Sequence, residues 1–95
     1  MPETSLVPIE ARRRRLLFRA NHRGTQENDL LIGGYVGPRL HALTEADLDA
    51  LEAVMELPDV ELTDWLTGRV PIPPGPHRPL LEAIRAAALA RKDHV

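Results

Sequence analysis

The sequence predicts an all-α protein, a small five-helix bundle formed by one domain over residues 1–95. Hydrophobic residues make up 43% of the chain but aromatic residues only 3%, so the composition is poor in residues that favour sheets. Apolar residues recur at helical spacing, and proline and glycine separate the runs. A chain of this length leaves room for a single domain, and we expect residues 1–8 and 93–95 to be flexible.

The first two helices are expected over Ile9–His22 and 25–35, with a tight corner at Arg23–Gly24 between them. Pro8 is suited to a helix entry, and the expected apolar positions of the first helix are Ala11, Leu16 or Leu17, Phe18 and Ala20. Thr25 is the expected N-cap of the second helix. The continuous apolar run Leu30–Ile32 indicates a helix buried on most sides, and Gly37–Pro38 is expected to end it.

The third helix has the clearest start signal, with Thr44 as N-cap and Asp47 as the acidic partner of a capping box. Leu43 and Leu48 are spaced as a hydrophobic staple, and Pro58 is expected to end the helix. A short fourth helix follows, capped by Asp59 and closed by Gly68, with an inner face of three residues: Leu62, Trp65 and Leu66.

Five prolines between residues 71 and 79 predict a stiff, extended spacer before the last helix, which is expected over Pro79–Arg91. The candidates for burial in that helix are Leu80, Leu81, Ile84, Ala88 and Leu89. The connections elsewhere are short, so we expect neighbouring helices to pack nearly antiparallel.

The net charge of −2 conceals an asymmetric distribution. Residues 1–23 carry six arginines against two acids, whereas residues 24–66 carry one arginine against ten acids. This pattern favours an oriented encounter with a charged protein surface, or internal compensation with the basic first helix lying over the acidic third.

Arg12–Arg15 could also neutralise phosphates, so a small helical nucleic-acid-binding or regulatory module is the alternative function. The acidic pI of about 6.0 and the lack of an aromatic platform speak against it.

The residues that usually carry enzyme chemistry are sparse. Cysteine is absent, the four histidines lie far apart in sequence, and Ser5 is the only serine. The glycine-rich stretch 33–37 fits neither a P-loop nor a dinucleotide fingerprint. We therefore expect no enzyme activity, no metal site and no stably bound cofactor. No apolar run is long enough to span a bilayer and no signal-like stretch begins the chain, so a cytoplasmic location is expected.

The most informative segment is residues 22–29. Arg23 and Glu27 are four residues apart across a helix start, and Gly24 allows a positive φ and a surface without a side chain. A partner could approach that backbone closely, and Arg23 offers a planar fork to carboxylate or carbonyl oxygens. The alternative is an exposed Arg23–Glu27 pair, which would add well under about 1 kcal/mol of stability.

Residues 16–19 and 22–31, followed by Pro58–Gly68 with its Asp-Trp-Leu segment, resemble the SdhE (YgfY, Sdh5-type) family of succinate dehydrogenase assembly factors. The family hallmark is an Arg-Gly-x-x-Glu motif, matched by Arg23, Gly24 and Glu27. The resemblance implies a small five-helix protein that acts as a chaperone. It would bind the flavoprotein subunit of succinate dehydrogenase, and in some members that of fumarate reductase, and promote covalent attachment of FAD.

The resemblance also implies where the partner binds, and which chemistry belongs to the partner. FAD would belong to the flavoprotein, whose own histidine forms the covalent bond, and this chain would contribute binding and geometry as a monomer. The expected partner-binding residues are Arg19, His22, Arg23, Gly24, Glu27 and Asp29.

Overall fold

The computed structural model describes residues 8–93. Within that range the protein has five α-helices, one 3₁₀ turn and no strand, which confirms the predicted all-α class. The elements in chain order are α1 (Pro8–Asn21), α2 (Gln26–Arg39), η2 (Leu40–Ala42), α3 (Glu45–Met55), α4 (Asp59–Leu66) and α5 (Arg78–Asp93).

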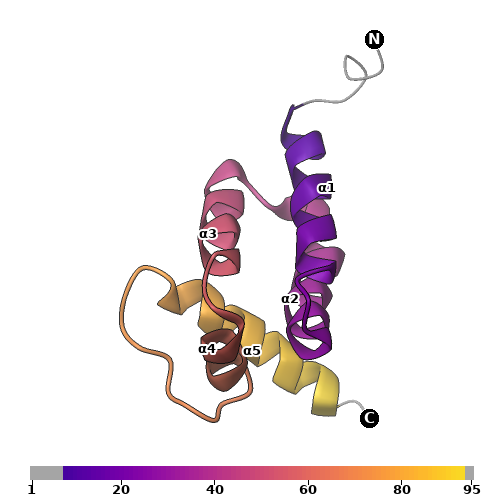
Figure 1. The fold of residues 1–95 in the computed structure, drawn as a ribbon. Helices are drawn as coiled ribbons and strands as arrows, with labels where there is room; N and C mark the ends of the chain where they lie inside the picture. The colour runs from indigo at the N-terminus through magenta and orange to yellow at the C-terminus, as the bar shows by residue number, and fades with distance from the viewer. Residues whose placement is uncertain (1–7, 94–95) are drawn as a thin grey trace.

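Helices α1 and α2 form an antiparallel hairpin whose corner lies at the end opposite the N-terminus (Figure 1). Helix α3 packs against α1, and α5 crosses the bundle in contact with α2, α3 and α4. The expected antiparallel packing of neighbours is therefore confirmed for α1 and α2. It is wrong for α3 and α4, which do not contact each other because each packs against α5 instead.

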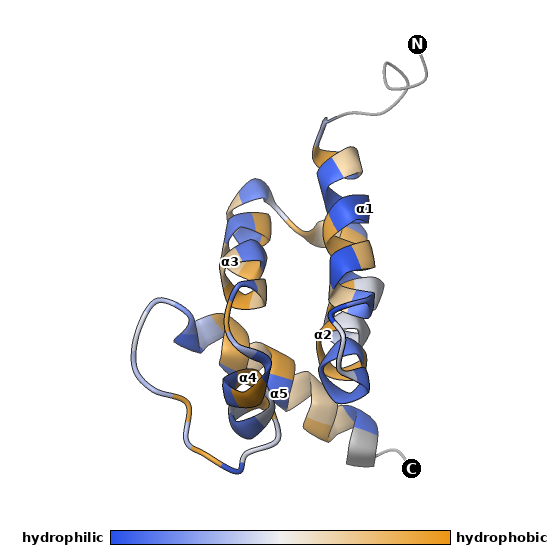
Figure 2. Ribbon diagram, in the orientation of Figure 1, coloured by the Kyte–Doolittle hydropathy of each residue, from blue (hydrophilic) through white to orange (hydrophobic). Residues whose placement is uncertain are grey.

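The core draws aliphatic side chains from all five helices. Ile32, Leu48, Leu62 and Ile84 are completely buried, and none of the three aromatic residues is among the buried set. The helices carry hydrophobic and hydrophilic residues on different faces, and α1 shows hydrophilic turns along much of its length (Figure 2). Aliphatic side chains thus form the buried core, and Tyr35 and Trp65 pack against it while partly exposed.

Helix α1 begins one residue earlier and ends one residue earlier than predicted, at Pro8 and Asn21. Leu16 and Ala20 are buried as expected, but Phe18 is 63% exposed and does not belong to the core. Its ring instead stacks on His22, with centroids 4.1 Å apart. The two residues lie one turn apart on the outer face, where the stacked pair shields part of each ring from water.

Helix α2 continues to Arg39, four residues beyond the predicted end, through Gly37 and Pro38. The prediction was wrong because Val36 and Leu40, on either side of Gly37 and Pro38, are buried, and this tertiary packing outweighs the poor helix propensity of glycine and proline. Pro38 falls in the last turn. Leu30 is 65% exposed, so the helix is buried on one side rather than on most sides.

The predicted capping box of α3 is confirmed. The Thr44 hydroxyl accepts from the Asp47 backbone N–H at 3.1 Å, and the Asp47 carboxylate accepts from the Thr44 backbone N–H at 2.9 Å. Leu43 and Leu48 of the staple are both buried. The helix ends at Met55, before Pro58, which caps the next helix instead.

Helix α4 has Pro58 as its N-cap, so the prediction that Asp59 caps it is wrong. Leu62 and Leu66 are buried, Trp65 packs against the core while partly exposed, and Gly68 has the expected positive φ of 81°.

The proline-rich connection after α4 contains no helix and is anchored by one buried side chain, Ile72. Helix α5 starts at Arg78, and its predicted core residues Leu81 and Ile84 are buried. Leu89, expected to be buried, is 52% exposed.

Pro8 and Asp93, two of the residues expected to be flexible, are the first residue of α1 and the last residue of α5. The rest of that expectation concerns residues 1–7, 94 and 95, which lie outside the described residues, as does Ser5. Among the helices of residues 8–93, none combines the length and the hydropathy that a bilayer crossing requires.

Candidate protein-docking site

The corner between α1 and α2 is a bare turn. Gly24 has φ of 118°, a value that side-chain-bearing residues rarely adopt, which confirms the predicted positive φ. Gly24 is exposed, and a Cβ added there would meet no atom within 4 Å. Glu27, exposed in the first turn of α2, and His22, exposed after the end of α1, flank it. We call His22, Gly24 and Glu27 the docking corner.

The Arg23 side chain points into the protein, with 11% of its surface exposed. Its Nε and Nη2 donate to Asp59 Oδ1 at 3.1 and 2.9 Å, Nη2 also donates to the Leu57 carbonyl at 3.1 Å, and Nη1 donates to the Met55 carbonyl. The planar guanidinium of Arg23 thus binds the connection between α3 and α4. The predicted alternative of an Arg23–Glu27 pair is replaced by an Arg23–Asp59 pair.

A second polar side chain supports this contact from α2. Asn28 is completely buried, and its Nδ2 donates to the Asp59 carbonyl at 3.0 Å and to Asp59 Oδ1 at 3.2 Å. The Thr63 hydroxyl donates to Asn28 Oδ1 at 3.0 Å. We call Arg23, Asn28, Asp59 and Thr63 the Arg23 clamp. Buried polar groups are stable only when they are paired, and these four pair with one another across three helix ends.

Sequence reasoning missed Asn28, Asp59 and Thr63 as members of the site. A polar residue between two acids at a helix start is expected to be exposed to solvent, so the sequence did not indicate that Asn28 is buried. Asp59 was assigned to helix capping, and its Arg23 partner lies 36 residues away in sequence. No local spacing rule connects residues that far apart.

The other predicted partner-binding residues make internal contacts. Asp29 Oδ1 accepts from the Arg23 backbone N–H at 2.7 Å and fixes the corner from the α2 side. His22 Nδ1 donates to the Phe18 carbonyl at 2.7 Å. Arg19, 43% exposed, pairs with Glu56 at 2.9 Å and Glu52 at 3.5 Å on α3. The corner is therefore held by its own side chains, while Gly24 and Glu27 face outward.

Two arginines of the run Arg12–Arg15 are engaged in contacts within the protein. Arg12 contacts three carboxylates of α3: Glu45 and Asp49, both at 2.7 Å, and Glu52 at 3.1 Å. The hydrogen bonds that the Arg12 guanidinium donates to Asp49 first, and then to Glu45, raise its pKa above the ordinary value. Arg13 donates to the Leu43 carbonyl at 2.6 and 3.1 Å. The predicted compensation between the basic first helix and the acidic third is confirmed, and two of the four arginines are exposed: Arg14 and Arg15.

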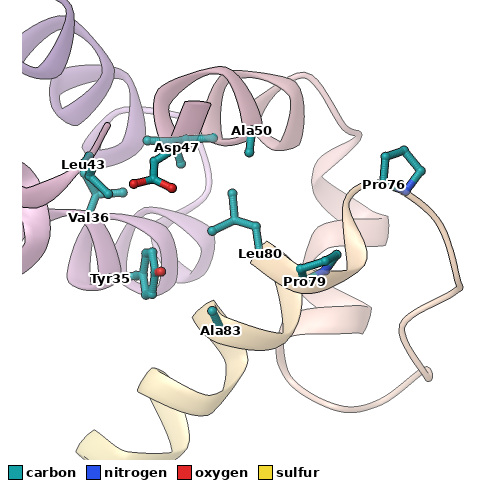
Figure 3. Close-up of a pocket in the computed structure, with 10 residues that line it drawn as sticks. Tyr35, Val36, Leu43, Asp47, Ala50, Pro76, Pro79, Leu80 and Ala83 are labelled. Carbon is teal, nitrogen blue, oxygen red and sulfur yellow. The ribbon is translucent and has the colours of Figure 1, made fainter. Parts of the chain in front are cut away.

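A hollow of about 430 Å³ lies between α2, α3 and α5, with Leu80 projecting between the ribbons of α2 and α3 (Figure 3). Its lining is mostly aliphatic, and its carboxylate, Asp47, is already engaged in the capping box. No group of three His, Cys, Asp or Glu side chains in the described part of the chain could hold a metal ion.

Comparison with known proteins gives one coherent result. The family model described as "Flavinator of succinate dehydrogenase" (Sdh5) matches residues 14–88, which include the docking corner and the Arg23 clamp. The FAD assembly factor SdhE of Acetobacter pasteurianus is 53% identical over 77% of this chain and 67% of its own length.

Eukaryotic relatives are more distant and longer. The mitochondrial succinate dehydrogenase assembly factor 2 of Dictyostelium discoideum is 34% identical over 68% of this chain, and the match spans only 46% of that protein. The corresponding protein of Yarrowia lipolytica is 32% identical over 90% of this chain and 62% of its own length. No solved structure gives a significant match. The chain belongs to the Sdh5 family, the flavinators of succinate dehydrogenase.

Proposed function

We propose that this protein binds the flavoprotein subunit of succinate dehydrogenase and promotes covalent attachment of FAD to that subunit. The observation that carries the proposal is the docking corner: an open Gly24 with φ of 118° and an exposed Glu27, on a turn fixed by buried polar contacts. A rigid, bare corner loses little conformational freedom on binding, which leaves more of the contact energy for affinity.

The protein acts as a chaperone and not as an enzyme. Its role is to bias the flavoprotein toward the conformation in which its own histidine and FAD react, which is all that a binding partner does thermodynamically. The protein holds no FAD of its own, acts as a monomer without nucleic acid, and works in the cytoplasm of a bacterium. The flavoprotein of fumarate reductase, built around the same cofactor, is a second client.

Under this proposal the residues of the Arg-Gly-x-x-Glu motif have two different roles. Glu27 makes a charge-assisted contact to the flavoprotein, and Gly24 permits the close approach of the two backbones. Arg23 holds the corner in place through Asp59, and its effect on docking passes through that geometry. Arg23→Lys therefore fails to rescue fully, because lysine lacks the fork that reaches one carboxylate and two carbonyls together.

The test measures covalent flavin on the succinate dehydrogenase flavoprotein, by in-gel fluorescence after denaturation, in cells that lack their own factor. Wild type restores the band, whereas Gly24→Arg and Glu27→Ala do not. Gly75→Arg is the control for the first variant, since Gly75 also has positive φ and no atom within 4 Å of an added Cβ. Glu61→Ala is the control for the second, an exposed acid in the first turn of α4.

Circular dichroism and immunoblotting of each variant separate lost docking from lost fold. If Gly24→Arg and Glu27→Ala both restore the fluorescent band at normal abundance, the proposal that this corner meets the flavoprotein is wrong.

A further inference from the structure

A groove of about 390 Å³ lies between α2, the end of α4 and α5, and Glu27 of the docking corner is one of its lining residues. Its volume falls within the range of roughly 300–1,000 Å³ typical of binding clefts. Three helices form its walls: α2, the end of α4 and α5, which contact one another pairwise (Figure 1). The residues that matter for binding are Glu27, Leu31, Leu66, Ala88, Leu89 and Arg91.

The groove has an apolar floor and an apolar rim. Leu66 is buried at its base, Leu31 is half-buried, and Leu89 is 52% exposed at its edge. Of the three leucines that line the groove, Leu89 is the exposed one, and at the edge of a concave apolar surface its side chain is available for contact with another protein.

The charges at the two ends of the groove have opposite signs. Glu27 stands in the first turn of α2. The Arg91 guanidinium lies over Gly34, where a Cβ would come within 3.0 Å of Arg91 Cζ. Gly34 is seven residues beyond Glu27, so the acid and the base are about 10 Å apart along the helix axis at 1.5 Å per residue.

We infer that this groove receives a surface helix of the flavoprotein subunit. The helix would place a basic residue against Glu27, an apolar residue against Leu31 and Leu89, and an acidic residue against Arg91. Two turns of an α-helix also span about 10 Å, so these three residues would stand at positions i, i+3 or i+4, and i+7. The inference rests on the proposed function, and it extends the contact surface from the docking corner to α5.

The test measures the affinity of the purified full-length protein for the purified flavoprotein subunit by biolayer interferometry. Leu89→Asp places a charge in the apolar rim and should raise Kd about tenfold or more, as loss of a central apolar contact does. Ala90→Asp is the matched control: an exposed neighbour on the same helix, outside the groove lining, that receives the same charge. It should leave Kd within about twofold, because a residue outside the contact surface contributes little to affinity.

Three outcomes separate the inference from the proposed function. Wild type that does not bind the flavoprotein at all contradicts the proposed function itself. Wild type that binds, with Leu89→Asp binding as tightly as Ala90→Asp, overturns the groove while leaving the docking corner intact. A dimer of wild type that Leu89→Asp converts to monomer in sedimentation, with unchanged Kd for the flavoprotein, shows that the groove takes a second copy and also overturns the inference.

Discussion

Removal of the Asp59 carboxylate should destabilise the protein far more than removal of an exposed acid. Asp59 Oδ1 accepts two hydrogen bonds from Arg23 and one from Asn28, and the Arg23 and Asp59 side chains are 11% and 34% exposed. Asp59→Ala leaves the Arg23 cation with only two carbonyl acceptors and no counter-charge. It also deprives a completely buried amide of part of its bonding.

The magnitude follows from the burial of the pair. Exposed ion pairs contribute about 0.2–1 kcal/mol, and breaking a fully buried pair costs about 3–5 kcal/mol. The intermediate burial of this pair places the loss for Asp59→Ala at about 2–3 kcal/mol. Since 1 kcal/mol shifts the Tm of a domain of this size by about 4–8 °C, the expected fall in Tm is about 8–24 °C.

The assay is thermal unfolding followed by circular dichroism at 222 nm, with urea unfolding to obtain the free energy. Glu61→Ala removes an exposed acid from the same helical turn and measures the contribution of the helix dipole alone, about 0.3–1 kcal/mol. If the free energies of unfolding of Asp59→Ala and Glu61→Ala agree within about 0.5 kcal/mol, the clamp does not hold the corner.

Three further predictions concern charge, backbone and core. Arg12→Ala should lower the free energy of unfolding at low salt and lower it by less in 1 M NaCl, because its three carboxylate partners are exposed; an equal loss at both salt concentrations in urea titrations contradicts this. Gly24→Ala should cost about 1 kcal/mol in the same assay, from the positive φ alone, because nothing surrounds the added methyl group; a loss above about 3 kcal/mol would show a steric clash. Leu62→Ala should cost about 2–5 kcal/mol and Leu30→Ala under about 0.5 kcal/mol, since the first is fully buried and the second 65% exposed; similar Tm values for the two variants would refute this description of the core.

The elements that sequence reasoning predicted well are those that carry a local signal. The capping box of Thr44 and Asp47 needs only residues three apart, and the positive φ of Gly24 follows from glycine between two helical runs. The end of α2 was mispredicted because the burial of Val36 and Leu40 carries the helix through Gly37 and Pro38, and spacing within α2 does not reveal those tertiary contacts.

The sequence predicted where the candidate site lies, but not which of its residues face outward and which hold the turn. The corner at residues 22–27 is where the sequence indicated it, with Gly24 and Glu27 exposed. Arg23 was expected to face a partner, whereas its fork is satisfied by Asp59 and two carbonyls between α3 and α4. Leu89 was assigned to the core because its helical period matches that of Leu81 and Ile84, and periodicity does not tell a core face from the rim of a groove.

The Arg23 clamp also has a consequence for the order of events in folding. Its bonds join atoms of residues 31 to 36 positions apart in the chain, so each requires the closure of a long loop before it can form. The hairpin of α1 and α2 relies on contacts that are closer in sequence and form faster. The corner therefore gains its final geometry only after α3 and α4 have reached their native places. A half-folded or truncated molecule presents Gly24 and Glu27 on a turn held only by its local contact to Asp29, and recognition through this corner becomes a check that the whole domain is complete.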